Sequence, residues 1–304
     1  MPGRYAASVV QALALRLEAV PAPGLALLAL ILLNLMWGGS LPATKVALES
    51  FGPFTLAAAR LVLAGVLFVM AAGPAALAKT PRQDAAQMAI LGVLGFAAVQ
   101  VFQALGAGRT SAASATVLAS TGPVWIALLA PLVLHERPTV TTFGGVLLAL
   151  FGVAAITGID SPEPQGAFIV LASSVAYALY TVMGKQLAQR RSPLQFCAIS
   201  CLGGAVATLP LAIWEITSQG VPRPTPEGWA LLAYLAILVT FVGFAIWFWG
   251  LRALPAARAG ALIFLQPLSG LAMAVLLLGD RPTPTFAVGC VLVLVGVTVS
   301  AGRA

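Results

Sequence analysis

Long runs without a charged residue dominate the chain and set its organisation. Nine uncharged stretches of at least 21 residues follow one another: 19–44, 85–108, 110–134, 138–159, 164–184, 192–214, 228–251, 259–279 and 282–302. A tenth apolar segment, 53–72, is interrupted only by Arg60. Since about 20 apolar residues let a helix cross the hydrocarbon core of a bilayer, the pattern predicts an all-α membrane protein with ten transmembrane helices.

The composition excludes most soluble classes of protein. Apolar residues make up 60% of the 304 positions and charged residues only 8%, and the mean hydropathy is +1.01. A soluble domain carries charge on about a quarter of its residues, so soluble enzymes, disordered proteins and nucleic-acid-binding proteins are excluded. In a membrane protein, the net charge of +7 raises the question of the side of the membrane on which the basic residues lie.

The distribution of Lys and Arg predicts the orientation. If both termini are cytoplasmic, the cytoplasmic segments hold eleven basic residues and the opposite segments hold four. Cytoplasmic loops are enriched in basic residues, so we expect a multi-pass protein of the cell (inner) membrane with both termini in the cytoplasm. The apolar run from Ala26 is longer than the core of a signal peptide, which is about 7–15 residues. Residues 1–23 are therefore expected to form a cytoplasmic segment before a retained first span.

The second half of the chain repeats the first. Shifted by 144 positions, residues 132–153 (LVLHERPTVTTFGGVLLALFGV) align with residues 276–297 (LLLGDRPTPTFAVGCVLVLVGV), with 11 of 22 residues identical. A shift of 140 aligns Trp37 with Tyr177 and Lys45 with Lys185. We therefore expect two five-helix repeats, residues 24–160 and 161–304. Because five is odd, the second repeat enters the membrane from the opposite side, and such inverted repeats are typical of secondary transporters that work by alternating access.

Several motifs resemble those of one transporter family. They are Trp37-Gly38-Gly39-Ser40, Pro53-Phe54 followed by Arg60, a proline in the fourth and ninth spans, and the turns Glu136-Arg137-Pro138 and Asp280-Arg281-Pro282. In order and spacing they resemble the EamA-type proteins of the drug/metabolite transporter (DMT) superfamily, over about residues 25–302. The resemblance implies export of small metabolites, including amino acids and aromatic ones, through a cavity between spans 1, 3, 4, 6, 8 and 9.

Polar and aromatic side chains inside the spans are the candidate substrate contacts, because such groups are costly in lipid and usually face protein or water. Asn34 and Trp37 share one helix face in the first span, and Ser173, Tyr177 and Tyr180 are spaced in the same way in the sixth. The full set of predicted substrate-binding residues is Asn34, Trp37, Gln100, Gln103, Ser173, Tyr177, Tyr180, Thr240, Trp247 and Gln266. Amides, hydroxyls and rings suit a neutral or zwitterionic metabolite better than a phosphorylated one.

A second set of residues is expected to have gating or structural roles. Pro42 and Pro267 can break a helix or free a carbonyl. Arg60 is the one charge deep within a span, where it is expected to be an anchor or to act on a gate. Lys45 and Lys185 end equivalent spans, so they either extend to the interface or act as matching gates. His135 and Glu136 are expected to lie in a solvated turn.

Missing motifs exclude other classes. The chain has no G-x-x-x-x-G-K-[ST] sequence for nucleotide binding and no H-E-x-x-H, and it has one His. We therefore expect no enzyme activity, no cofactor and no metal site. No span is expected to hold an Asp or Glu at depth, which disfavours a proton-coupled exporter of cationic drugs.

The sequence thus predicts a secondary transporter, independent of ATP, that exports small neutral or zwitterionic metabolites, with amino acids preferred. Its expected partners are the small-molecule substrate and the lipid bilayer, without nucleic acid, and it is expected to be a monomer or homodimer. A facilitative carrier of a sugar, nucleoside or purine is the main alternative. A channel or a sensor that does not transport also stays open.

Overall fold

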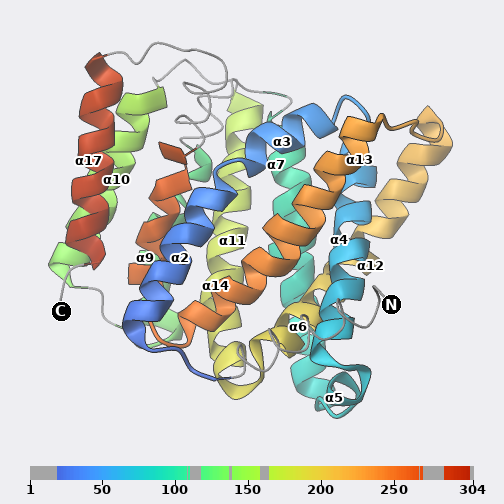
Figure 1. Ribbon diagram of the computed structural model, residues 1–304, viewed down its shortest axis with the longest axis horizontal. Helices are drawn as coiled ribbons and strands as arrows, with labels where there is room; N and C mark the ends of the chain where they lie inside the picture. Colours follow the sequence, from blue (N-terminus) through green and yellow to red (C-terminus); the bar gives the residue numbers. More distant parts are fainter. Residues whose placement is uncertain are drawn as a thin grey trace, which may run out of the picture.

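The computed structural model describes residues 19–107, 109, 118–136, 139–157, 164–266, 268–269 and 284–301 (Figure 1). Within these ranges all regular secondary structure is helical, which confirms the predicted all-α class. The elements are α2 (Pro23–Trp37), α3 (Ser40–Ala47), α4 (Pro53–Ala72), α5 (Pro74–Ala78), α6 (Arg82–Gly92), η1 (Val93–Ala98), α7 (Val99–Ala107), α9 (Gly122–Val133), α10 (Val140–Thr157), α11 (Pro164–Arg190), α12 (Pro193–Gln219), α13 (Pro226–Ala233), η2 (Tyr234–Val242), α14 (Gly243–Leu251), α15 (Ala256–Ala261), η3 (Leu262–Phe264) and α17 (Pro284–Ala301).

Five helical segments of the described chain are long and apolar enough to cross a membrane: Pro53–Ala72, Arg82–Gly106, Phe168–Arg190, Pro193–Gln219 and Pro226–Leu251. Four shorter apolar helices accompany them: Pro23–Trp37, Gly122–Val133, Val140–Ala155 and Val291–Ser300. The molecule is therefore a multi-pass membrane protein, and the total of ten spans stays a prediction. The expected segment 1–23 lies mostly outside the described residues.

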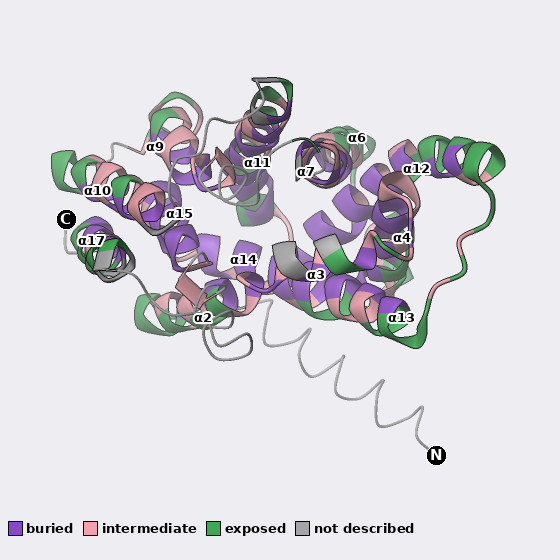
Figure 2. Cartoon of the chain, turned by 90° about the horizontal axis from the view of Figure 1, so that it is seen from above, coloured by how far each residue is buried: buried purple, intermediate pink, exposed green. Residues whose placement is uncertain are grey.

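Two helix pairs lie at opposite ends of the long axis of the molecule. The α4–α12 pair lies at one end and the α10–α17 pair at the other, with α2, α9, α11, α14 and α15 between them (Figures 1 and 2). The faces that these helices turn toward one another are buried (Figure 2). This arrangement places the elements that carry most of the predicted substrate-binding residues in the middle of the molecule.

Four glycines bring α10 and α17 into close contact. A Cβ on Gly145 would lie 2.6 Å from the carbonyl oxygen of Gly296, and a Cβ on Gly152 would lie 2.8 Å from that of Gly289. The contacts run in opposite directions along the two helices, so the helices are antiparallel. The repeat alignment equates Gly145 with Gly289 and Gly152 with Gly296. The contact is therefore reciprocal, as a two-fold axis requires.

Both halves also contain a π-helix at equivalent positions. η1 begins at Val93 and η2 at Tyr234, so the two starts are 141 residues apart, close to the repeat shift. In Figure 1 the α6–η1–α7 segment ascends, while the α13–η2–α14 segment descends. The periodicity of apolar residues does not show these π-helices, which are rare and are frequent at functional sites.

Two sequence expectations are wrong at helix boundaries. The chain between α2 and α3 is interrupted at Gly38 and Gly39, and not at Pro42. Pro42 lies in the first turn of α3, where a backbone N–H has no partner within the helix, so the proline is tolerated. In addition, α12 continues five residues beyond Trp214 to Gln219. Glu215 therefore lies inside a membrane-spanning helix, and not in a loop.

Candidate functional site

Three rings from different helices meet in the middle of the molecule. Trp37 ends α2, Trp247 belongs to α14 and Tyr177 belongs to α11. The ring centroids are 5.8 Å apart for Trp37 and Trp247, and 6.2 Å apart for Trp247 and Tyr177. The structure therefore brings the repeat-equivalent residues Trp37 and Tyr177 into contact with the same ring. We call these three residues the aromatic group.

Close packing against η2 and α14 fixes Trp37. Its indole nitrogen donates a 2.9 Å hydrogen bond to the carbonyl oxygen of Val239. Gly243 makes room for the ring, because a Cβ there would lie 2.3 Å from the same nitrogen. Phe244 adds a further ring contact, with centroids 5.3 Å apart. The side chain of Trp37 is therefore oriented before any ligand binds.

The aromatic group also holds a polar atom without a partner in the described part of the chain. The indole nitrogen of Trp247 and the hydroxyl of Tyr177 are buried, and the indole nitrogen forms no hydrogen bond within the described residues. The hydroxyl of Thr181, one turn along α11, lies next to that of Tyr177 and interacts with it. Since buried polar groups are nearly always hydrogen-bonded, the indole nitrogen of Trp247 is the candidate donor to a polar group of a bound molecule.

An amide pair joins the first half of the molecule to the second. Gln266 donates from Nε2 to Oδ1 of Asn34 over 2.9 Å, and Asn34 donates from Nδ2 to the carbonyl oxygen of Leu30 over 2.7 Å. Asn34 and Gln266, both among the predicted substrate-binding residues, thus bind one another in this conformation. Pro267, the next predicted residue, lies outside the described residues.

Three other predicted substrate-binding residues do not join the aromatic group. Ser173 donates to the carbonyl oxygen of Val170 in its own helix over 2.6 Å. Gln103 is half-buried on α7. Tyr180 has no exposed surface, because its ring packs among aromatic side chains with centroids 5.2–5.5 Å away: Phe96, Phe196 and Phe248. The structure therefore packs Tyr180 in the core in this conformation, with no exposed surface, as it does Trp247.

Arg60 binds two residues that the sequence assigns to the substrate. Its Nε donates to the hydroxyl of Thr240 over 2.6 Å, and its Nη1 donates to Oε1 of Gln100 over 2.9 Å. Thr240 in turn donates to the carbonyl oxygen of Leu235, five residues earlier in η2, over 2.8 Å. The π-helix thus orients the hydroxyl that holds Arg60. Gln100 and Thr240 are partners of Arg60 in this conformation.

A buried ion pair joins three elements near the end of α11. Lys185 is 3% exposed, and its ammonium group donates to Glu136 and, over 2.6 Å, to the carbonyl oxygen of Leu254. The second oxygen of Glu136 accepts from the backbone N–H of Ala256, the first residue of α15, over 2.7 Å. The expectation that Lys185 extends to the interface is therefore wrong, whereas Glu136 lies in a turn with its side chain 26% accessible. We call this region the Lys185 end.

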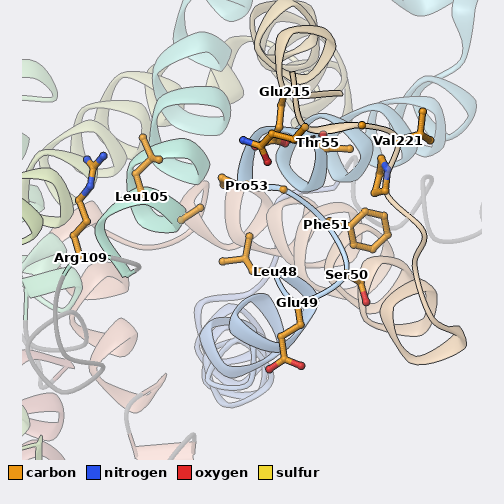
Figure 3. Close-up of a pocket in the computed structure, with 15 residues that line it drawn as sticks. Leu48, Glu49, Ser50, Phe51, Pro53, Thr55, Leu105, Arg109, Glu215 and Val221 are labelled. Carbon is orange, nitrogen blue, oxygen red and sulfur yellow. Dashed lines mark hydrogen bonds between the residues drawn. The ribbon is translucent and has the colours of Figure 1, made fainter. Parts of the chain in front are cut away.

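The opposite end holds a hollow beside a buried carboxylate. Glu215 is 3% exposed and accepts 2.7 Å hydrogen bonds from the backbone N–H and the hydroxyl of Thr55 in the first turn of α4. The adjacent hollow has a volume of about 580 Å³ (Figure 3). We call it the Glu215 hollow, and its lining is Leu48–Pro53, Thr55, Ala104, Leu105, Arg109, Glu215 and Gln219–Pro222. Sequence reasoning missed it because it placed Glu215 in a loop. The side chain of Lys45 lies outside the described part of the chain.

Membrane-spanning helices in two related halves, with rings and amides buried between them, define the class of polytopic secondary transporters. The sequence profile of the EamA-like transporter family matches residues 24–158 and again residues 164–302. The chain therefore belongs to the EamA-like transporter family of the DMT superfamily. The family therefore occurs once in each half of the chain, and the protein is a transporter.

Relatives and a solved structure agree with this assignment. The chain is 31% identical to a protein of Streptantibioticus cattleyicolor named "Probable terminal-alkyne amino-acid exporter", over 88% of this chain and 91% of that protein. It is 27% identical to an uncharacterized transporter of Archaeoglobus fulgidus, over 86% and 94% of the two chains. A solved crystal structure with 21% identity shares the fold with a TM-score of 0.78, over 90% and 96% of the two chains.

Proposed function

We propose that this transporter exports small neutral or zwitterionic metabolites by alternating access, and that amino acids, including aromatic ones, are its substrates. The aromatic group carries the proposal, because it combines ring faces with a buried indole nitrogen that has no partner within the described residues. Rings of a substrate gain about 0.5–1.5 kcal/mol from such aromatic pairing beyond burial. The similarity to a protein named as an amino-acid exporter supports the same substrate class.

The Lys185 end supplies the closed gate of this mechanism. The ion pair of Lys185 and Glu136 ties α11, the turn after α9 and the start of α15 together. Opening that end requires the pair to separate. The repeat alignment equates Lys185 with Lys45 and Glu136 with Asp280. We expect Lys45 and Asp280 to form the corresponding gate at the other end when the Lys185 end opens.

The predicted orientation decides which end of the molecule opens to which side of the membrane. With both termini cytoplasmic in the inner membrane, the Lys185 end faces the cytoplasm and the Glu215 hollow faces outward. Cysteine labelling from outside should then modify a cysteine placed after Pro162, and should leave one after Arg303 unmodified. Labelling of the second position from outside would reverse the proposed direction.

Counterflow in proteoliposomes tests the substrate class. Liposomes that contain the purified protein and millimolar unlabelled L-phenylalanine should accumulate external labelled L-phenylalanine transiently, whereas protein-free liposomes should not. A panel of L-leucine, glucose, adenine and uridine inside the liposomes then ranks the solutes. Exchange driven by a sugar or a nucleobase, with none by an amino acid, would favour the alternative carrier. Flux that does not saturate would indicate a channel.

A further inference from the structure

Arg60 is a buried cation whose known partners are all neutral. Its side chain is 6% exposed, and its hydrogen bonds lead to the hydroxyl of Thr240 and the amide oxygen of Gln100. Neither partner carries a charge that offsets that of the guanidinium group. Burial of an uncompensated charge is costly, and buried charges are usually paired with an opposite charge.

The acidic residues of the described chain are occupied elsewhere. Asp84 pairs with Arg191, Glu136 pairs with Lys185, and Glu215 caps α4. Glu49 and Glu227 are exposed. None of these five carboxylates forms an ion pair with Arg60. The described residues therefore leave the positive charge of Arg60 without an anion.

The guanidinium group also keeps a free donor. Nε and Nη1 are used, whereas Nη2 forms no hydrogen bond with any described residue. The two neighbouring polar side chains, Tyr234 and Cys201, donate instead to the carbonyl oxygens of Met36 and Leu61. The planar fork of arginine matches the two oxygens of a carboxylate. Arg60 is thus held in place on one edge while a donor on the other edge remains available.

The Glu215 hollow lies close to Arg60 along two helices. Thr55 and Ala104 line the hollow (Figure 3). Arg60 follows Thr55 by five residues on α4, and Gln100 precedes Ala104 by four residues on α7. At about 1.5 Å per helical residue, these separations correspond to roughly 6–8 Å. Arg60 and Gln100 thus follow the lining residues of the hollow within about one and a half helical turns along α4 and α7.

The π-helix η2 places Arg60 near the aromatic group as well. Val239 accepts the hydrogen bond of Trp37, and the next residue, Thr240, accepts that of Arg60. Adjacent residues of one element thus hold the ring and the cation. A molecule with an aromatic or apolar side chain and a carboxylate has the two chemical features that this pair recognises.

We propose that Arg60 binds the carboxylate of the transported amino acid. The inference rests on the proposed function. It adds that the substrate must carry a negative charge, which the rings of the aromatic group alone do not require. Gln100 and Thr240 are positioning residues for Arg60. Replacement of the carboxylate of a ligand by an uncharged group should then weaken binding only in a protein that has the guanidinium group of Arg60.

The test compares three ligands as inhibitors of L-phenylalanine counterflow. The ligands are L-phenylalaninamide, phenethylamine and 3-phenylpropionate. With the unmodified protein, 3-phenylpropionate should inhibit, whereas the two ligands without a carboxylate should be weaker by about ten- to a hundredfold, as loss of a hydrogen bond between charged groups predicts. In Arg60→Gln this preference for the carboxylate should fall to less than about threefold. Arg60→Lys, which retains the charge without the fork, should keep part of it.

Arg82→Gln is the matched control, since it removes the same charge from an exposed residue at the start of α6, outside the lining of the hollow; it should retain the full preference. Equal inhibition by all three ligands in the unmodified protein would overturn the inference without use of any variant, and so would an unchanged preference in Arg60→Gln. Inhibition of L-phenylalanine counterflow by chloride alone, with no preference for the ligand that carries a carboxylate, would also overturn it. Absence of any amino-acid counterflow would instead remove the proposed function itself.

Discussion

Each end of the molecule holds a carboxylate that caps a helix, half-buried for Glu136 and buried for Glu215, and the two ends differ in what accompanies it. Glu136 accepts from the first backbone N–H of α15, and Glu215 accepts from the first turn of α4. Each carboxylate thus caps a helix N-terminus, where negative charge is favoured. Glu136 also pairs with Lys185. Glu215 forms no ion pair within the described chain and borders a hollow of about 580 Å³.

In the proposed mechanism, this difference closes a nearly symmetric protein at the Lys185 end. The repeats supply equivalent lysines at positions 45 and 185 and equivalent acids at positions 136 and 280. In this conformation the pair at the Lys185 end is formed. Because each half can adopt the conformation of the other, the same chemistry is available to close the opposite end. The ion pair at the Lys185 end should therefore control which side is open.

Removal of Lys185 should have the largest effect. Loss of one partner of a buried pair costs about 3–5 kcal/mol, so Lys185→Met should favour the open Lys185 end. We expect at least a tenfold faster reaction of a cysteine at position 254 with a water-soluble maleimide, in a variant without Cys197, Cys201 and Cys290. Arg191→Met is the control, because Arg191, which pairs with Asp84 at the same end, is more exposed than Lys185, with side chains 34% and 4% accessible. Equal labelling of both variants would contradict a gating role.

Substitution in the aromatic group should alter affinity without altering the gate. Trp37→Ala should raise the KM for L-phenylalanine counterflow by about 2–13-fold, which corresponds to the loss of an aromatic pair. The labelling of a cysteine at position 254 should stay unchanged. Trp214→Ala is the control, because Trp214 is 58% exposed at the periphery of α12. If both variants lose activity in proportion to protein abundance, the rings only stabilise the fold.

Glu215→Gln should have a smaller effect on stability and none on the gate. Loss of a helix cap costs about 1 kcal/mol, so we expect the melting temperature to fall by about 2–4 °C. The substitution affects only the Glu215 end, so labelling of a cysteine at position 254 should match that of the unmodified protein. An increase comparable to that of Lys185→Met would show that the two ends are not independent.

The smallest effect is expected from the proton gradient. Both carboxylates already accept hydrogen bonds from fixed donors, Glu136 from Lys185 and Ala256, and Glu215 from Thr55. We therefore expect facilitated transport or exchange driven by the substrate gradient. Initial rates in liposomes should be unchanged when a protonophore dissipates the pH difference. Strict dependence on an imposed pH step would identify one of these carboxylates as a proton site.

The fold class and the duplication could be predicted from the sequence because both depend on patterns of residues that are close together in the chain. Charge-free runs define the apolar helices, and the aligned glycines of 132–153 and 276–297 become the reciprocal contact between α10 and α17. The break at Gly38–Gly39 and the two π-helices were missed. These features depend on how neighbouring helices pack, and a one-dimensional pattern does not contain that information.

The site was predicted in part. Trp37, Tyr177 and Trp247 were identified as polar or aromatic positions within spans, and the structure brings them together. Tyr180 has the same spacing along α11, yet it packs in the core, because a face of one helix contacts several neighbours. Partners distant in sequence were not predictable. Lys185 and Glu136 are 49 residues apart, and Arg60 and Thr240 are 180 residues apart.

Reversible locking of the Lys185 end tests the central claim most directly. In a variant without native cysteines, Lys185→Cys and Glu136→Cys can be bridged by a short bis-methanethiosulfonate reagent and released by dithiothreitol. If this end must open in every cycle, L-phenylalanine counterflow should fall to the protein-free level on cross-linking and return on reduction. Modification with the corresponding monofunctional reagent should leave counterflow active. Full counterflow by the cross-linked protein would contradict alternating access through the Lys185 end.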